Sequence, residues 1–222
     1  MNIRIKICGI TNKEDALMCV ESGADALGFV FYEKSPRFLS SNAAADIVKA
    51  LPPFVTTVGV FVNQSHESIV DIAHRVGLDC VQLHGDEGVE DCRALSALRP
   101  IKAFRIKDAE DLRGIEAYSG LVSALLLDTR VEGAYGGTGR GFDRHLALPV
   151  KQYGRVILSG GLTPDNVVEA VKMVEPYGVD VSTGVESKPG RKDPLKVRRF
   201  IENIKRYEAT LLTEDKKGEP QR

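Results

Sequence analysis

The feature that most constrains the fold is an alternation of short apolar runs with stretches that carry helix start and stop signals. The alternation occurs eight times. The expected strands cover 4–9, 25–31, 55–62, 80–83, 101–104, 122–127, 156–158 and 179–181, and the expected helices cover 12–21, 41–51, 65–76, 89–98, 109–118, 142–152, 164–174 and 193–206. The strands are apolar enough to be covered on both faces, as in a parallel sheet. Eight such units predict an α/β fold, a single (β/α)8 TIM barrel.

A doubly wound open sheet is the competing architecture. It would place a G-x-G-x-x-G turn after the first strand, and that turn is absent from the sequence. We expect the barrel to occupy residues 1–207. Residues 208–222 are polar and end in a stretch with Gly and Pro, so we expect a disordered C-terminal tail.

Composition excludes several classes of partner and places the chain in a reducing compartment. At 222 residues the chain fits one domain, and its net charge of −1 provides no basic field for nucleic acid or an acidic membrane. It has no apolar run of about 18 residues and no signal-peptide pattern. Its 4 cysteines form no C-x-x-C pair. Free thiols of this kind suit the cytoplasm.

Two strand-to-glycine turns near the end of the chain predict a phosphate site. One apolar strand stops at Ser159-Gly160-Gly161, and the next stops at Ser182-Thr183-Gly184. Glycines between a strand and a helix allow bare backbone N–H groups to approach an anion. Neighbouring turns of this kind after strands seven and eight are typical of the phosphate site of a (β/α)8 barrel.

Cys8 and Asp128 are the candidate reactive residues, because each ends a predicted strand. Most free cysteines are small buried hydrophobes, but Cys8 stands at a strand end beside a glycine, and Lys6 on the same strand face would help to hold a thiolate. An Asp after an apolar strand is often a cap. The glycine-rich loop at 133–141, however, is better suited to a lid over a ligand, and an apolar wall would raise the pKa of the Asp128 carboxyl.

Four further polar residues are candidates for substrate binding. Arg37 lies in a polar loop, where most arginines are only solvated, yet its fork would fit a carboxylate. Gln82 and His84 share a strand face. His84 and Asp86 would make a weak metal pair without a third ligand, so we expect no metal site. Asp180 in strand eight would face strand one and pair with a buried Lys6.

With these residues in place, the chain closely resembles the phosphoribosylanthranilate isomerase family of tryptophan biosynthesis. The matching pieces are K-I-C-G-I-T at 6–11, D-A-L-G-F-V-F at 25–31, S-P-R at 35–37, G-V-F-V-N at 59–63, V-Q-L-H-G-D-E at 81–87, L-L-L-D-T at 125–129, G-G-T-G at 136–139, S-G-G-L at 159–162 and D-V-S-T-G-V-E at 180–186. They follow one another in order at predicted strand ends. Where the family usually continues with F-D-W, this chain has Phe142-Asp143-Arg144, which affects the packing of the sixth helix.

The resemblance implies an Amadori rearrangement of N-(5-phosphoribosyl)anthranilate to 1-(2-carboxyphenylamino)-1-deoxyribulose 5-phosphate, the third step of tryptophan synthesis from chorismate. It implies no cofactor and no metal. Asp128 matches the general acid of the family and Cys8 the general base. Arg37 matches the group that binds the anthranilate carboxylate, and the two glycine turns match the phosphate site. Whether the chain is a monomer or a homodimer stays open.

Three alternatives compete with this interpretation. A pentulose-phosphate epimerase would need a metal-binding set of His and Asp at several strand ends, and only His84 and Asp86 are available. An indole-glycerol-phosphate synthase would be expected to have Lys where Cys8 stands. A non-catalytic barrel that binds a phosphorylated metabolite would keep the glycine turns but would have no reason to keep both Cys8 and Asp128.

Overall fold

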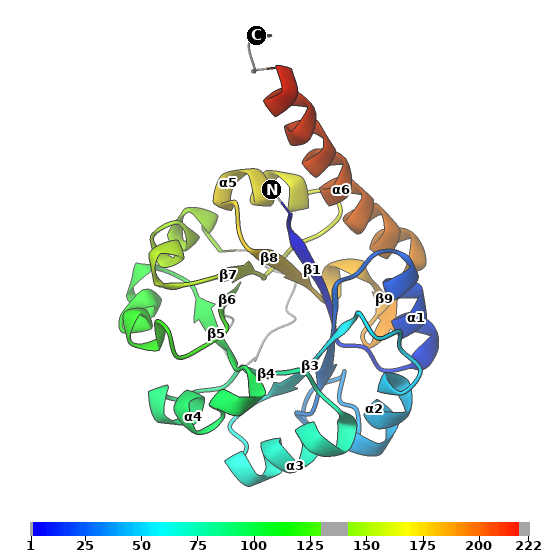
Figure 1. The fold of residues 1–222 in the computed structure, drawn as a ribbon, viewed down its shortest axis with the longest axis vertical. Coiled ribbons are helices and arrows are strands. Elements are labelled where there is room, and N and C mark those ends of the chain that lie inside the picture. The colour runs from blue at the N-terminus through cyan, green and yellow to red at the C-terminus, as the bar shows by residue number, and fades with distance from the viewer. Residues whose placement is uncertain (1, 130–141, 218–222) are drawn as a thin grey trace.

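The structure is a computed structural model that describes residues 2–129 and 142–217, with side chains to residue 212. Eight parallel strands close into a barrel in chain order, as predicted (Figure 1). They are β1 (Arg4–Cys8), β2 (Ala26–Val30), β3 (Thr56–Phe61), β4 (Cys80–Leu83), β5 (Ile101–Ile106), β6 (Ala124–Thr129), β7 (Val156–Leu158) and β8 (Gly178–Val181). The barrel closes between β8 and β1, where Lys6 is in register with Asp180.

Helices surround the barrel on its outside (Figure 1). They are α1 (Lys13–Glu21), α2 (Ser41–Val48), α3 (His66–Val76), α4 (Val89–Ala94), α5 (Val167–Val174) and α6 (Pro194–Lys217). Asn12, Ser40 and Ser65 cap α1, α2 and α3 with their side-chain oxygens, because these residues satisfy N–H groups that the first turn leaves free. Helix α5 begins at Val167, three residues later than predicted, after a turn in which Asn166 accepts a hydrogen bond from the Thr163 N–H.

The fifth and sixth predicted helices are wrong. Residues 109–118 form two 3₁₀ turns, η2 (Ala109–Leu112) and η3 (Ile115–Tyr118), separated by Gly114 in the left-handed region. Residues 144–153 form η4 (Arg144–Ala147) and η5 (Pro149–Tyr153). Pro149 has no N–H to continue the η4 turn as an α-helix. Smaller elements absent from the prediction are η1 (Ser96–Leu98), η6 (Thr183–Val185) and a hairpin of β9 (Glu186–Lys188) and β10 (Arg191–Lys192).

The last helix extends past residue 207, where we expected the barrel to end. Helix α6 continues to Lys217 and projects beyond the ring of helices (Figure 1). Glu208, expected in a disordered tail, is buried and accepts a hydrogen bond from the N–H of Ile3. Polar composition alone does not end a helix, and the stretch after residue 207 has neither Gly nor Pro before Gly218. Residues 218–222 lie outside the described part of the chain.

The interior of the barrel is divided into an apolar end and a polar end. At the N-terminal ends of the strands, Val58, Cys80, Ile101, Ala124 and Ile157 belong to a small apolar cluster of their own. The inward positions further along the strands carry the buried polar side chains of Lys6, Gln82, Asp128 and Asp180. A larger core of aliphatic residues packs the helices on the outside of the barrel. The polar end therefore coincides with the C-terminal ends of the strands, where barrel enzymes have their active sites.

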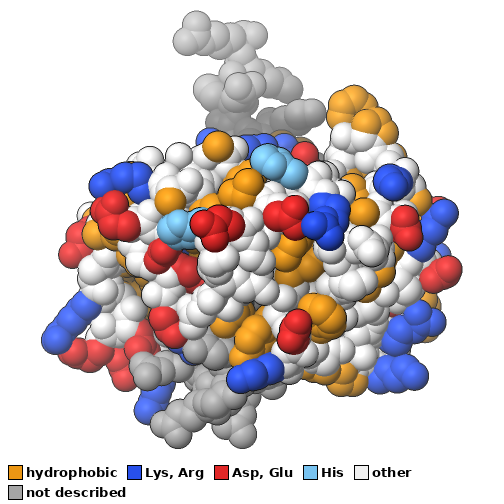
Figure 2. Space-filling view, turned by 90° about the horizontal axis from the view of Figure 1, so that it is seen from below, with side chains coloured by type: hydrophobic (Ala, Val, Ile, Leu, Met, Phe, Trp, Pro, Cys, Tyr) orange, Lys and Arg blue, Asp and Glu red, His pale blue; other side chains and the backbone are white. Residues whose placement is uncertain are grey.

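The outer surface carries charges of both signs. The face in Figure 2 shows acidic and basic side chains interspersed, without a large patch of one sign. Among the described residues, no helix combines the length and the apolar character that a membrane crossing requires.

Candidate active site

Cys8 is the last residue of β1 and points into the polar end of the barrel, buried to 8% exposure. Its neighbour on β2 is Gly28, and a Cβ atom at that position would lie 2.7 Å from the Cys8 sulfur. A glycine is therefore required for the thiol to fit. Burial raises the pKa of the Cys8 thiol, and the nearby Lys6 ammonium opposes this effect without overcoming it. Lys6 thus favours the thiolate form of Cys8, as expected, but the effect of burial on the pKa is larger.

Lys6 is the centre of a buried polar network. Its Nζ atom lies 2.9 Å from Asp180 Oδ1 and 2.9 Å from Gln82 Oε1, and a third interaction reaches the sulfur of Cys8. The predicted ion pair between strands one and eight is thereby confirmed. Burial lowers the pKa of Lys6, but the charges of Asp180 and Cys8 outweigh burial, so the net shift is upward and the ammonium is retained.

The network continues from Gln82 to Asp128. Gln82 Nε2 lies 2.7 Å from His84 Nδ1, and His84 Nε2 lies 3.3 Å from Asp128 Oδ2. The second pair is close enough for an ion pair but is not aligned as a hydrogen bond, so His84 Nε2 has no hydrogen-bond partner among the described residues. The other Asp128 oxygen accepts a hydrogen bond from the Thr129 N–H at 2.8 Å. Buried side chains thus connect the two candidate reactive residues across the barrel.

His84 and Asp86, which the sequence analysis considered and set aside as a weak metal pair, have different partners in the structure. His84 is buried against Gln82 and Asp128, whereas Asp86 is exposed and its carboxylate lies 2.5 Å from Arg105 Nη2. The two side chains therefore belong to different surroundings. The loop at 133–141, expected to be a lid, lies outside the described residues.

The two glycine turns meet at a small cavity of about 30 Å³. Its lining residues are Asp128, Ser159, Gly160, Gly161, Leu162, Asp180, Val181, Ser182, Thr183 and Gly184. Gly160 and Gly161 have φ values of 80° and 64°, which favour glycine, and their N–H groups donate to no other described residue. The Ser182 hydroxyl is buried and likewise has no hydrogen-bond partner in the described part of the chain. Unpaired donors around a cavity are the chemistry that an anion requires.

Arg37 is held beside this cavity by a residue that the sequence analysis missed. Glu186 accepts from Arg37 Nε at 2.8 Å and from Arg37 Nη2 at 2.6 Å, and Arg37 Nη2 also donates to Thr183 Oγ1 at 3.1 Å. One side of the guanidinium fork is therefore occupied, and Nη1 remains for a ligand. Lys192, also missed, donates to Glu186 at 2.9 Å and to the carbonyl oxygen of Cys8 at 2.6 Å.

A sequence signal existed for only one of these two residues. Glu186 ends the D-V-S-T-G-V-E motif and could have been singled out as a buried partner for an arginine. Lys192 lies in a short hairpin whose sequence gives no sign that the chain turns back over β1.

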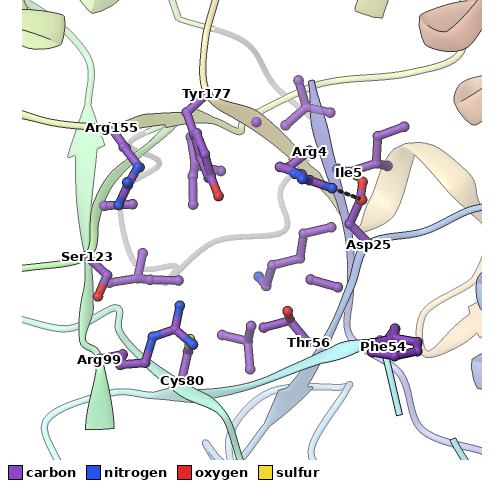
Figure 3. A pocket seen from close by; sticks show the side chains of 18 residues that line it. Arg4, Ile5, Asp25, Phe54, Thr56, Cys80, Arg99, Ser123, Arg155 and Tyr177 are labelled. Carbon is purple, nitrogen blue, oxygen red and sulfur yellow. Dashed lines mark hydrogen bonds and ion pairs between the residues drawn. The ribbon is translucent and has the colours of Figure 1, made fainter. Parts of the chain in front are cut away.

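A larger cavity of about 380 Å³ lies at the opposite end of the barrel (Figure 3). Residues at the N-terminal ends of the strands surround it, including Arg4, Arg99 and Arg155. The apolar cluster of the barrel interior forms part of its lining. None of the predicted catalytic or substrate-binding residues lines it, although Lys6 of the buried network does.

The comparisons with known proteins agree with this geometry. The sequence profile of the family described as PRAI, N-(5'phosphoribosyl)anthranilate (PRA) isomerase, matches residues 5–203. The N-(5'-phosphoribosyl)anthranilate isomerase of Geobacter sulfurreducens is 56% identical over 203 residues, which cover 91% of this chain and 98% of the relative.

Two solved structures show the same fold. A phosphoribosyl anthranilate isomerase in complex with reduced 1-(o-carboxyphenylamino)-1-deoxyribulose 5-phosphate has a TM-score of 0.83 and 47% identity, covering 92% of this chain and 99% of that one. Monomers generated from the dimeric enzyme of Thermotoga maritima have a TM-score of 0.83 and 45% identity, with the same coverage of 92% and 99%. The chain therefore belongs to the N-(5'-phosphoribosyl)anthranilate isomerase family of tryptophan biosynthesis.

Proposed function

We propose that this chain isomerises N-(5-phosphoribosyl)anthranilate with Asp128 as the general acid and Cys8 as the general base. Asp128 gives its proton to the furanose ring oxygen, and the bond from that oxygen to the anomeric carbon breaks to leave a Schiff base. Cys8, as the thiolate, takes the proton from C2′, and the resulting enolamine tautomerises to the ketone. Protons move within the substrate and no atom is gained or lost. The observation that carries the proposal is the buried network that connects Cys8 and Asp128 beside an anion-binding cavity.

The three parts of the substrate match three parts of the site. The glycine turns, with Gly160, Gly161, Ser182, Thr183 and Gly184, bind the phosphate, since the N–H groups of Gly160 and Gly161 and the Ser182 hydroxyl have no partner among the described residues. Arg37 binds the anthranilate carboxylate through Nη1, the edge that Glu186 leaves open. Asp180, Gln82 and His84 face the ribose between the two ends. A ligand with a phosphate at one end and a carboxylate at the other would be held by both.

The test follows the loss of anthranilate fluorescence when the substrate is generated in situ, in buffer with EDTA. We expect rapid decay with the wild type and loss of more than a hundredfold in rate for Cys8→Ser and for Asp128→Asn, because each variant removes one proton-transfer group. Cys80→Ser is the matched control, since Cys80 is also buried in a barrel strand but lies at the opposite end. Near-normal turnover of either variant would assign that role to another residue. Decay only after a divalent metal is added would favour the epimerase alternative.

For the assembly, we infer a homodimer formed by the face in Figure 3. Phe54 stands at the edge of the larger cavity and is 97% exposed, an unfavourable position for an aromatic ring in a lone molecule. The Phe54 ring and a cavity with an apolar lining lie on the same face. Two copies related by a two-fold axis could therefore each insert this ring into the cavity of the other. The dimeric relative from Thermotoga maritima supports this choice of partner.

Sedimentation velocity at several concentrations measures the assembly. We expect a dimer for the wild type and a monomer for Phe54→Asp, because the short, hydrated aspartate cannot replace the apolar contact that the phenylalanine ring makes with the cavity. Leu195→Asp, which changes another exposed apolar residue on α6, is the control and should leave the dimer intact. A monomeric wild type, or a dimeric Phe54→Asp variant, would contradict the inferred interface.

The cytoplasm is the proposed location of the enzyme. All four cysteines, Cys8, Cys19, Cys80 and Cys92, are free and buried, which suits a reducing compartment. Fractionation of cells that produce the chain measures this directly, and recovery from a membrane or extracellular fraction would contradict it.

A further inference from the structure

The donors and acceptors in the buried network determine which nitrogen of His84 carries the hydrogen. Lys6 is an ammonium and can only donate, so the Gln82 atom that faces it at 2.9 Å must be the carbonyl oxygen Oε1. The amide nitrogen of Gln82 then faces His84 Nδ1 at 2.7 Å and must donate to it. Nδ1 therefore accepts, and the neutral ring carries its hydrogen on Nε2.

The Nε2–H group of His84 is aimed at Asp128 but does not complete a hydrogen bond. Nε2 lies 3.3 Å from Asp128 Oδ2, and it is buried with no hydrogen-bond partner among the described residues. A buried donor without a partner is costly, so its partner must appear during the reaction. The nearest acceptor is the Asp128 carboxylate.

We propose that Lys6, acting through Gln82, fixes His84 in the Nε2–H tautomer, and that His84 is a positioning residue for Asp128. The O–H bond of Asp128 breaks as its proton passes to the ring oxygen of the substrate, and the carboxylate left behind accepts the hydrogen bond from His84. His84 itself transfers no proton. A hydrogen bond formed mainly after proton transfer stabilises the transition state more than the ground state. The link to catalysis rests on the proposed role of Asp128, whereas the tautomer does not.

The tautomer is measured by ¹⁵N NMR of the imidazole nitrogens, with the His84 signals identified by their loss in His84→Phe among the 4 histidines of the chain. In the wild type we expect a protonated Nε2 and an unprotonated Nδ1. Gln82→Glu keeps the shape of the side chain but places a carboxylate oxygen opposite Nδ1. An ionised carboxylate oxygen can only accept a hydrogen bond. In that variant Nδ1 should gain a hydrogen. Gln152→Glu, on the exposed η5 turn, adds the same charge elsewhere and should change neither nitrogen.

The effect on catalysis is measured by steady-state kinetics of two substitutions at residue 84. His84→Phe removes the donor, and we expect kcat to fall about 10- to 150-fold with a small change in KM, because a hydrogen bond to a charged group is lost in the transition state. His84→Gln should recover part of this loss, since its amide oxygen can accept from Gln82 while its nitrogen donates toward Asp128. Equal activity losses in both variants would reduce His84 to a packing role.

The outcomes separate the two proposals. A hydrogen on Nδ1 in the wild type, or unchanged nitrogen signals in Gln82→Glu, would overturn the relay from Lys6. An active Asp128→Asn variant would overturn the proposed acid and leave the tautomer measurement standing. Because the wild-type spectrum alone decides the tautomer, the test holds even if Gln82→Glu does not fold.

Discussion

Gly184→Ala is the most informative single substitution in the phosphate site, because Gly184 brings two loops into backbone contact. A Cβ atom at residue 184 would lie 1.8 Å from the carbonyl oxygen of Leu162, in the loop that follows β7. The Cβ position is fixed by the backbone of residue 184, and the atom it would meet is a backbone oxygen, so no side-chain rotation can relieve the clash. Real Cβ atoms stay at least 3.0 Å from such neighbours, so the loops must separate by roughly 1.2 Å.

Two effects of different kind should follow from that displacement. Overpacking costs about 1–3 kcal/mol, which corresponds to a fall in melting temperature of roughly 2–12 °C for a chain of this size. The same shift moves donors of one glycine turn away from a phosphate held by the other. Losing one hydrogen bond to a charged ligand costs about 1.5–3 kcal/mol, or roughly a 10- to 150-fold weaker inhibition constant for inorganic phosphate.

Calorimetry measures the first effect, and competitive inhibition by inorganic phosphate measures the second. Gly88→Ala is the matched control, because its Cβ would meet only Asp91 Oδ2 at an ordinary 3.8 Å and its φ of −86° suits alanine. If Gly184→Ala bound phosphate as tightly as the wild type, the two turns would not form one site. A reduced melting temperature with unchanged phosphate binding would leave Gly184 as a packing residue only.

Three further predictions concern residues around the site and the C-terminus. Burial raises the pKa of Glu186, but hydrogen bonds from Arg37 and a neighbouring lysine outweigh burial and hold it below the ordinary 4.5. The Glu186 carboxylate therefore stabilises the fold above pH 4.5, and this contribution is lost as the pH falls. In denaturant titrations at pH 7, the free energy of unfolding of Glu186→Gln should be lower than that of the wild type by about 3 kcal/mol, and this difference should narrow toward pH 3. A difference that does not change with pH would contradict the prediction. Arg37→Lys keeps the charge but loses the fork, so KM for the substrate should rise about tenfold while phosphate inhibition stays unchanged, and equal losses in both would remove the carboxylate role. Truncation after Tyr207 removes the Glu208 carboxylate that accepts the N–H of Ile3, and calorimetry should show a melting temperature lower by several degrees; no change would mean that the contact contributes nothing.

The parts of the fold that depend on local chemistry were predictable from the sequence. The strands that end at Cys8, Thr129 and Leu158, each within two residues of the predicted end, follow from apolar runs. The helix caps at Asn12 and Ser65 follow from side chains that bond the first turn. The ion pair of Lys6 and Asp180 followed from the closure of the barrel and the alternation of strand residues.

What could not be predicted depends on contacts between distant parts of the chain. The hydrogen bond from Arg37 to Glu186 connects residues 149 positions apart, and the hydrogen bond from Lys192 to the Cys8 carbonyl oxygen connects residues 184 positions apart. No local pattern encodes the Lys192 contact, and the motif that ends at Glu186 does not indicate which arginine is its partner. The same holds for the net pKa of Cys8, because burial and the ammonium act in opposite directions and only the three-dimensional arrangement decides which prevails. Helix α6 extends to Lys217, beyond the expected end, because polar composition alone does not end a helix without Gly or Pro.

The closure of the barrel has a consequence for how the enzyme is made on the ribosome. Lys6 and Cys8 are synthesised well before their partners Asp180 and Lys192, which follow 174 and 184 positions later in the chain. A nascent chain that has completed seven strands still has no counter-ion for the Lys6 ammonium and no anchor for the end of β1. Since domains complete their folding as units, Cys8, the proposed general base, can reach its final geometry only when the last barrel strand and the hairpin have emerged from the exit tunnel. Emergence of the last strand and of the hairpin, rather than growth of the early strands, is therefore the step that completes the polar end of the barrel.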